Sequence, residues 1–186
     1  ANPAALAAAR RQETEAAGRA LGASAFHFFE EADGSLKDIP ALAGRIAELV
    51  RTLRPDVLFC PDPWALYEAH QDHVVTGKAA AQAFISSALA GYPRGTGTQP
   101  WQPSAIAFYF TQNPNTVVDV TDTFEQKFAA MAMHRTQLNE ELLGLYRVYF
   151  TMQCQRLAQD KGFALGEGFK VLGPMHMHCF TEAPGI

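Results

Sequence analysis

The chain has 186 residues, of which 48% are hydrophobic and 18% charged, and this composition predicts one globular domain with a well-buried core. A formal net charge of −4, without any cluster of lysine and arginine, argues against a nucleic-acid-binding surface. The sequence also lacks the ~20 consecutive apolar residues of a membrane span and the basic, then apolar, start of a signal peptide. Three scattered cysteines, Cys60, Cys154 and Cys179, predict free thiols in a reducing compartment, so we expect a cytoplasmic protein.

Helices and strands are predicted to alternate from the start of the chain. Pro3 to Leu21 is rich in alanine and is followed by glycine, which indicates a helix. Residues 24–30, SAFHFFE, form a short aromatic run that predicts a buried strand, with His27 as a hydrogen-bonded core histidine. Ile39 to Leu53 has apolar residues at helical intervals, and DVLFCP at 56–61 reads as a second buried strand.

The later elements continue this alternation. Helices are predicted from the segment after His73 to about Leu89, over Phe124–Met133 and over Glu140–Ala158. Strands are predicted over 104–111 and 116–120, and the tail 169–180 is expected to be an edge strand plus a loop. The order predicts an α/β fold, with a Rossmann-like, mostly parallel sheet and flanking helices, over a single domain of residues 1–186. Because the chain opens on a helix, we expect the first strand of such a sheet to be absent from it.

Residues 70–73, His-Gln-Asp-His, are the pattern that best predicts chemistry. They follow the strand predicted at 56–61, and ligands bind at the carboxyl ends of strands in such sheets. Residues three apart on a helix are neighbours, about 5–6 Å between Cβ atoms, so His70 and His73 can share one small site. Neutral imidazole is a good zinc ligand, and Asp72 could orient one of the rings. The alternative is a polar helix start, at which Asp72 simply complements the helix dipole.

The match extends beyond this pattern. Residues 54–84, RPDVLFCPDPWALYEAHQDHVVTGKAAAQAF, resemble the PIG-L/LmbE-like de-N-acetylases, whose pattern is a strand, a loop and then His-x-Asp-His followed by a helix with a small residue. Other segments are similar to this family in the same order: Arg10, Glu13, Leu21 and Gly22 in an Arg-x-x-Glu helix, Asp33 and Gly34 after a strand, and NTVVDVTDTFEQKFAAMAMHRTQ with Lys127 and His134–Gln137.

The resemblance implies a hydrolase that uses Zn²⁺, or another divalent metal, to remove an N-acetyl group from an N-acetylglucosamine-type sugar or glycoside. It makes His73 a metal ligand and assigns catalysis to His70, which polarises the acetyl carbonyl or stabilises the oxyanion, and to Asp72, which tunes that ring. Arg10 and Asp33 match positions that contact substrate hydroxyls. The resemblance is also compatible with an oligomer.

The family's first metal motif, Ala-His-Pro-Asp-Asp, does not occur in this sequence. It supplies the remaining ligands and the general base, so we expect the family domain to be incomplete at its N-terminus here. Three interpretations stay open: a fragment of a longer polypeptide, one piece of a cleaved protein, or a shortened homologue without catalysis. The alternative function is accordingly binding of a sugar-like ligand, or a site that a second polypeptide completes.

Other residues are weaker candidates. His176 and His178 would point to one face of an extended strand and could approach a metal from the tail. Trp64 and Tyr67 could form the wall of a sugar pocket or simply pack in a loop. Cys60, at the end of a predicted strand, is expected to be a small buried residue and not a nucleophile.

Overall fold

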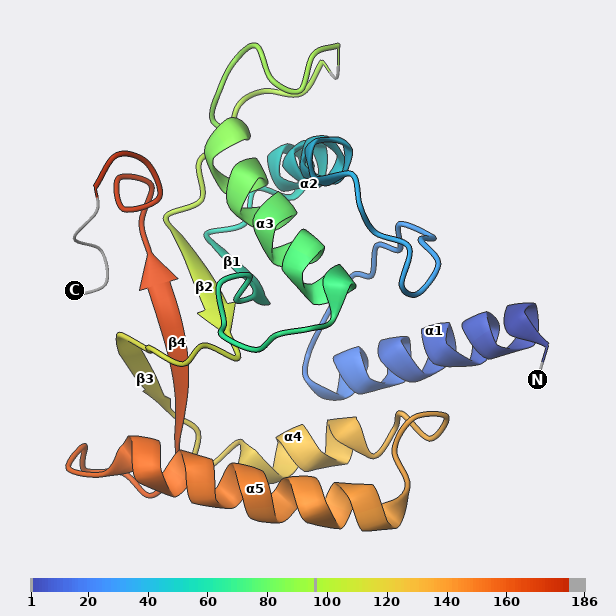
Figure 1. Ribbon diagram of the computed structural model, residues 1–186, viewed down its shortest axis with the longest axis vertical. Coiled ribbons are helices and arrows are strands. Elements are labelled where there is room, and N and C mark those ends of the chain that lie inside the picture. Colours follow the sequence, from blue (N-terminus) through green and yellow to red (C-terminus); the bar gives the residue numbers. More distant parts are fainter. Residues whose placement is uncertain (1, 96, 181–186) are drawn as a thin grey trace. The chain divides into compact units, whose positions relative to one another are not determined.

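The computed structural model describes residues 2–95 and 97–180, which form five helices and four strands (Figure 1). Their bounds are α1 Pro3–Ala20, α2 Ile39–Leu53, β1 Val57–Pro61, α3 Gln71–Ser86, β2 Ala105–Tyr109, β3 Thr116–Asp119, α4 Phe124–Met131, α5 Glu140–Ala158 and β4 Gly166–Leu172. The sheet has the order β1-β2-β4-β3. The predicted α/β fold with helices flanking a sheet is confirmed.

The pairings in the sheet are of both kinds. β1 and β2 pair in parallel, from Val57 with Ala105 to Pro61 with Tyr109. β2 and β4 pair antiparallel, with Ala107 opposite Val171. The strand expected in the tail is present as residues 169–172 of β4, which begins at Gly166, and turns follow it. Its expected edge position is wrong, because β4 has β2 on one side and β3 on the other.

The described chain divides into two compact units. Unit 1 contains residues up to 29 and residues 118–167, and unit 2 contains residues 30–117 and the chain from 168 onward. In unit 1, α1 contacts α4, and α4 and α5 enclose an aromatic cluster built on Phe124, Phe128 and Phe150. The single domain predicted over 1–186 stays a prediction.

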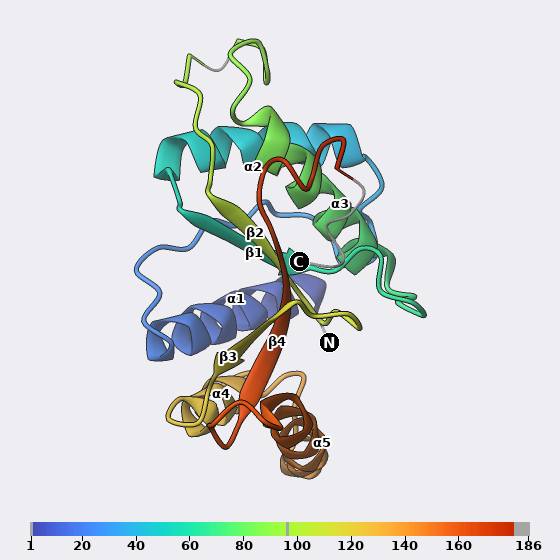
Figure 2. The same cartoon turned by 90° about the vertical axis from the view of Figure 1, so that its left-hand side faces the viewer.

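Unit 2 contains the larger core. Helix α3 packs on β1 and β2, and α2 packs on α3, as both ribbon views show (Figures 1 and 2). Phe84 of α3 is fully buried against Ile106 and Phe108 of β2. Four alanines of α3 belong to the buried set, at positions 79, 80, 81 and 83, and their small side chains let the helix lie close to its neighbours.

A buried arginine fixes the C-terminal end of α3. Arg51 of α2 is 3% exposed, and its Nε donates to the carbonyl of Ser87 at 2.9 Å. Its Nη2 donates to the carbonyls of Leu89 and Tyr92. The guanidinium therefore satisfies carbonyl groups at and beyond the end of the helix, and its charge complements the negative end of the helix dipole.

The segment predicted as the strand 24–30 is the main difference from the expected elements. It has no strand conformation, and His27 is exposed, so the prediction of a core histidine on a buried strand is wrong. The aromatic rings of this segment lie against α1 instead, with the Arg19 guanidinium 5.4 Å from the Phe26 ring centroid and that of Arg11 4.5 Å from Phe28. The apolar surface of residues 23–29 therefore packs on a helix and not on a neighbouring strand.

The three cysteines are free thiols, as predicted. Among the residues with described positions, no helix combines the length and the hydrophobicity that a membrane crossing requires.

Candidate functional site

Two histidine rings stack at the N-terminal end of α3. His70 is the N-cap residue, with an extended backbone, and His73 lies in the first turn of the helix. Their ring centroids are 4.5 Å apart, and the ring planes differ by 20°. About half of each side chain is exposed, so the pair faces solvent and can meet a ligand. The spacing of three residues thus brings the two rings together, as expected, while their roles stay predictions.

A glycine sets how closely α3 approaches the end of β1. A Cβ added at Gly77 would lie 2.4 Å from the carbonyl oxygen of Pro61 and 2.8 Å from Cδ of Pro63. Only a residue without a side chain allows this contact between helix and strand end. The resemblance had marked a small residue at this position, and the structure supplies the physical reason for it.

Glu68 binds both histidines from the chain segment before the helix. Its Oε1 accepts a hydrogen bond from the His70 backbone N–H at 2.7 Å, and its Oε2 lies 3.1 Å from Nδ1 of His73. These two bonds, the backbone one first, lower the pKa of the Glu68 carboxyl below its ordinary value. Because an ionised carboxylate only accepts, this hydrogen bond requires the proton on Nδ1 of His73, and in the neutral form of that ring Nε2 then has the lone pair.

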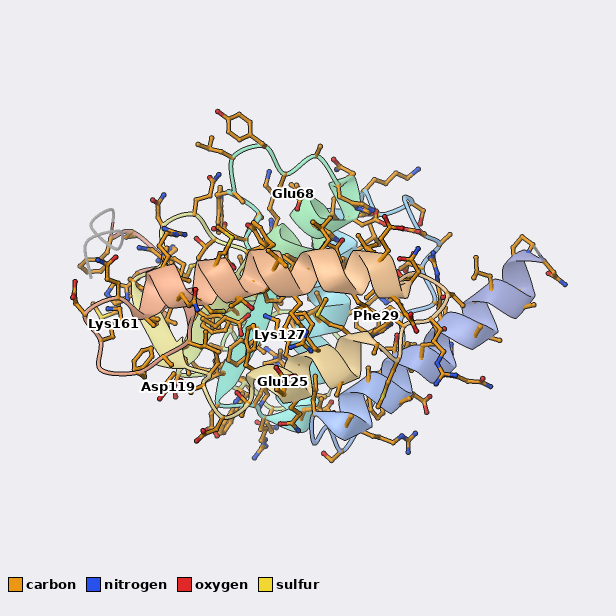
Figure 3. All side chains as sticks on the ribbon, turned by 90° about the horizontal axis from the view of Figure 1, so that it is seen from below. Phe29, Glu68, Asp119, Glu125, Lys127 and Lys161 are labelled. Atoms are coloured by element: carbon orange, nitrogen blue, oxygen red, sulfur yellow. The ribbon has the colours of Figure 1, made fainter. Side chains whose placement is uncertain are left out.

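Sequence reasoning missed Glu68, which lies two residues before the histidine pattern. An acidic residue just before a helix start was a signal, but a weak one, because such residues commonly cap helices. Figure 3 labels this side chain at the end of the segment that leads into α3.

Asp72 holds the loop that carries Asp33. Its carboxylate accepts the backbone N–H of Gly34 at 2.6 Å and that of Leu36 at 3.1 Å. Gly34 has a positive φ of 76°, a conformation that glycine adopts without strain. In this loop, Oδ1 of Asp33 lies 3.9 Å from Nε2 of His70. The structure therefore brings four of the five predicted site residues into one cluster, and it places Asp72 against the loop backbone.

The described residues fit a metal ion only in part. His73 has the form of a metal-ligating histidine, because a carboxylate holds one ring nitrogen and leaves the other for the metal. The Asp72 carboxylate, by contrast, is occupied by two backbone N–H groups. Within residues 2–95 and 97–180, no three side chains of histidine, cysteine, aspartate or glutamate gather as a metal-binding group. Zinc sites usually have three or four protein ligands, so these residues do not complete one.

Arg10, the fifth predicted residue, lies on α1 in unit 1. There the neighbouring Glu13 accepts hydrogen bonds from the Thr136 hydroxyl at 2.7 Å and the Thr136 backbone N–H at 2.9 Å. These bonds, followed by the nearby charges of His134 and Arg10, lower the pKa of Glu13. The Arg-x-x-Glu and His-Arg-Thr-Gln segments noted in the sequence are thus in contact within this unit.

The two aromatic candidates of the loop after β1 differ in their surroundings. Trp64 lies edge-on to Phe108, with ring centroids 5.5 Å apart, and borders a pocket of about 590 Å³ together with Tyr92 and Met177. Tyr67 is 94% exposed and has a φ of 68°. The role of these two side chains as a sugar-pocket wall stays a prediction.

The tail histidines do not lie on a strand. Residues 174–179 form turns, so the expectation that His176 and His178 share one face of an extended segment is wrong. Nδ1 of His176 accepts the N–H of Gly173 at 3.1 Å, and Nδ1 of His178 lies 3.3 Å from Sγ of Cys179.

Cys60 is buried in the core, as expected for a small structural residue. Burial, with a smaller contribution from Asp62, raises the pKa of its thiol to about 12. A thiol so hard to ionise is a poor nucleophile at neutral pH.

Comparison with known proteins identifies the family. The family model PIG-L, described as GlcNAc-PI de-N-acetylase, matches residues 1–84. The chain is 30% identical to the solved N,N′-diacetylchitobiose deacetylase from Pyrococcus horikoshii, with a TM-score of 0.90 over 97% of this chain and 69% of that one. The chain belongs to the PIG-L family. It is also 28% identical, over 176 residues, to the diacetylchitobiose deacetylase of Thermococcus kodakarensis, covering 93% of the PIG-L chain described here.

Relatives of this PIG-L chain do not all carry the same activity in their names. A 4-oxalmesaconate hydratase of Pseudomonas putida is 27% identical over 165 residues, which cover 82% of this chain. The chain spans 66% of the length of the Thermococcus deacetylase and 58% of the length of the hydratase. The comparison thus establishes the family and the fold.

Proposed function

We propose that this PIG-L chain belongs to a metal-dependent hydrolase that removes the N-acetyl group from an N-acetylglucosamine-type saccharide. The observation that carries the proposal is the stacked pair of His70 and His73, each with its own carboxylate, Asp33 and Glu68 respectively. Family membership and the similarity to two diacetylchitobiose deacetylases support the reaction and the substrate class.

His73 would be the metal ligand. Its Nδ1–H donates to Glu68, which fixes the ring tautomer and directs the Nε2 lone pair away from the protein carboxylate. Zinc, where bound, supplies Lewis acidity and a water whose pKa is lowered to about 7. The other ligands of such a metal are not found among the described residues, so the proposal assigns this chain one ligand only.

His70 would bind the acetamide. Its ring lies on that of His73 and is half-exposed, so it can donate a hydrogen bond to the acetyl carbonyl oxygen as negative charge develops there. Asp33, at 3.9 Å from the same ring, is 70% exposed and can accept a hydrogen bond from a sugar hydroxyl beside the acetamide. Arg10 is proposed as a second contact to substrate hydroxyls.

Asp72 would act as a positioning residue. Its carboxylate binds two N–H groups of the 33–36 loop and so fixes Asp33 beside His70. In Asp72→Asn, the amide nitrogen cannot accept one of these bonds, so the loop loosens. We expect faster hydrogen exchange at the amides of Gly34 and Leu36, together with a raised KM for the saccharide.

The experiment is an assay of acetate release from N,N′-diacetylchitobiose with the complete protein to which this chain belongs, loaded with Zn²⁺. We expect turnover that a chelator abolishes and that falls by at least about 100-fold in His70→Ala, the size typical of a lost oxyanion donor. His73→Ala should lose both turnover and bound zinc. His27→Ala is the matched control, because it removes an exposed histidine outside this cluster and should leave the rate unchanged.

Two other outcomes have a clear meaning. Hydration of 4-oxalmesaconate without acetate release would replace the proposal with the activity that the name of the Pseudomonas relative carries. Saccharide binding without turnover of either substrate, in zinc-loaded protein, would favour the non-catalytic alternative or a site that a second polypeptide completes.

A further inference from the structure

Helix α5 carries a row of exposed apolar side chains. The row consists of Leu145, Val148, Tyr149 and Met152, which are 63%, 59%, 57% and 66% exposed. These positions recur at intervals of three and four residues, so the four side chains lie on one face of the helix. The buried residues of α5, Cys154 and Ala158, lie on another face, and Phe150 packs against α4.

Such a face needs an explanation. Single exposed apolar residues are common, but the outward face of a surface helix is ordinarily polar. A contiguous apolar patch with a polar rim is typical of an interaction surface. The rim here is charged at both ends, with Glu141 before the row and Arg156 after it, and both are exposed. Neither has an ion-pair partner among the residues that the structure describes.

The row is symmetric about its own centre, between Val148 and Tyr149. Leu145 and Met152 lie three residues outside this central pair, and Glu141 and Arg156 lie seven residues outside it. At 100° per residue, all six positions fall on one side of the helix. When such a helix pairs antiparallel with a copy of itself, each residue meets the one at the same distance on the other side of the centre.

We propose that the α5 face docks against the same face of a second copy of this chain, as an antiparallel helix pair with two-fold symmetry. Leu145 then lies opposite Met152 of the second copy, and Val148 lies opposite its Tyr149. Glu141 lies opposite Arg156 of the second copy, at both ends of the pair. The antiparallel arrangement also sets the positive end of each helix dipole beside the negative end of the other.

The charges of Glu141 and Arg156 favour a second copy of this chain as the partner of the α5 face. A helix with unlike charges at its two ends complements itself only in the antiparallel direction, and the apolar row has its centre at the same point as the charges. The end charges are about 22 Å apart along one helix, so they cannot pair within a chain. Since one helix pair is small beside the roughly 800 Å² per partner of a standard interface, we expect a dimer that dissociates on dilution.

The test is sedimentation velocity of this 186-residue chain over a range of concentrations. The wild type should shift from a monomer of 20.3 kDa to a species of twice that mass as concentration rises. Val148→Lys places two lysines at the centre of the pair and should weaken the dimer by more than about tenfold. Leu53→Lys is the matched control, because it adds the same charge at a 51% exposed leucine on α2 and should leave the dimer intact.

Charge reversal decides the register. Glu141→Arg and Arg156→Glu should each weaken the dimer, by roughly three- to tenfold for two exposed ion pairs. The double variant re-creates both pairs with their signs exchanged and should recover the wild-type affinity. Three results would each overturn the proposal: a monomer at every concentration, a dimer whose affinity Val148→Lys does not change, or a double variant that dimerises as weakly as the single ones. A monomer whose α5 face is protected from solvent would assign the apolar row to another partner.

Discussion

The contact between α3 and the end of β1 makes Gly77→Ala a sensitive substitution. The added methyl would lie 2.4 Å from the Pro61 carbonyl oxygen and under 3.0 Å from two carbons of Pro63. These atoms cannot move freely, because Pro61 pairs with Tyr109 in the sheet. Helix α3 must therefore shift away from β1 by several tenths of an ångström, and this shift carries the His70–His73 pair with it.

Two opposing terms decide the size of the effect. Overpacking against fixed atoms costs about 1–3 kcal/mol, and the close approach to backbone favours the upper end of that range. Replacing a helical glycine by alanine returns about 1 kcal/mol of helix propensity. The free energy of unfolding should thus fall by about 2 kcal/mol, which lowers Tm by roughly 4–8 °C for a chain of this size.

Thermal and urea unfolding, followed by circular dichroism, measure this change, and Gly44→Ala is its matched control. Gly44 lies within α2 of the same unit, and an added Cβ there would meet only the Pro93 Cβ at 4.0 Å. That variant keeps the propensity gain without the clash and should be about 0.5–1 kcal/mol more stable than wild type. If Gly77→Ala is as stable as Gly44→Ala, the close packing of α3 on β1 is not what fixes glycine at position 77.

Three further predictions concern stability and reactivity. Arg51→Met should lower the free energy of unfolding by about 3 kcal/mol, because several carbonyl groups beyond α3 lose their donor; a urea midpoint close to wild type would contradict this. A thiol reagent at pH 8 should modify the exposed Cys179 in the folded protein and leave the buried Cys60 unmodified until denaturant is added; equal rates would contradict the burial. The pKa of the Glu68 carboxyl is depressed below 4.5 in the folded protein, so its contribution to stability should be complete above about pH 4.5 and be lost as the pH falls further. The Tm difference between wild type and Glu68→Gln should therefore shrink from pH 5 to pH 3. A constant Tm difference would show that the charge of this carboxylate does not matter.

Local patterns in the sequence were enough for most elements. The helices α2 and α5 have the predicted bounds, because apolar spacing and a flanking proline or asparagine mark them within the chain itself. The neighbouring position of His70 and His73 was equally predictable, since helix geometry fixes the spacing of residues three apart.

The exception among the elements is residues 24–30. Their aromatic composition favours a strand, yet a strand forms only where a neighbouring strand pairs with it. In this structure the rings of Phe26 and Phe28 have arginines of α1 as neighbours. The aromatic composition of a segment indicates that its apolar surface will be covered, and the neighbouring elements decide whether a strand or a helix covers it.

The sequence by itself determined the family pattern, the order of helices and strands and the pairing of two histidines, because these depend on residues close together along the chain. Only the tertiary structure decided what each carboxylate of the site does. It turned Asp72 toward the backbone of a loop more than 30 residues earlier, brought Asp33 beside His70, and assigned Glu68 to His73. Such contacts join residues that are far apart in the sequence, and they depend on how the chain folds back on itself. The spacing of residues along the sequence does not predict them.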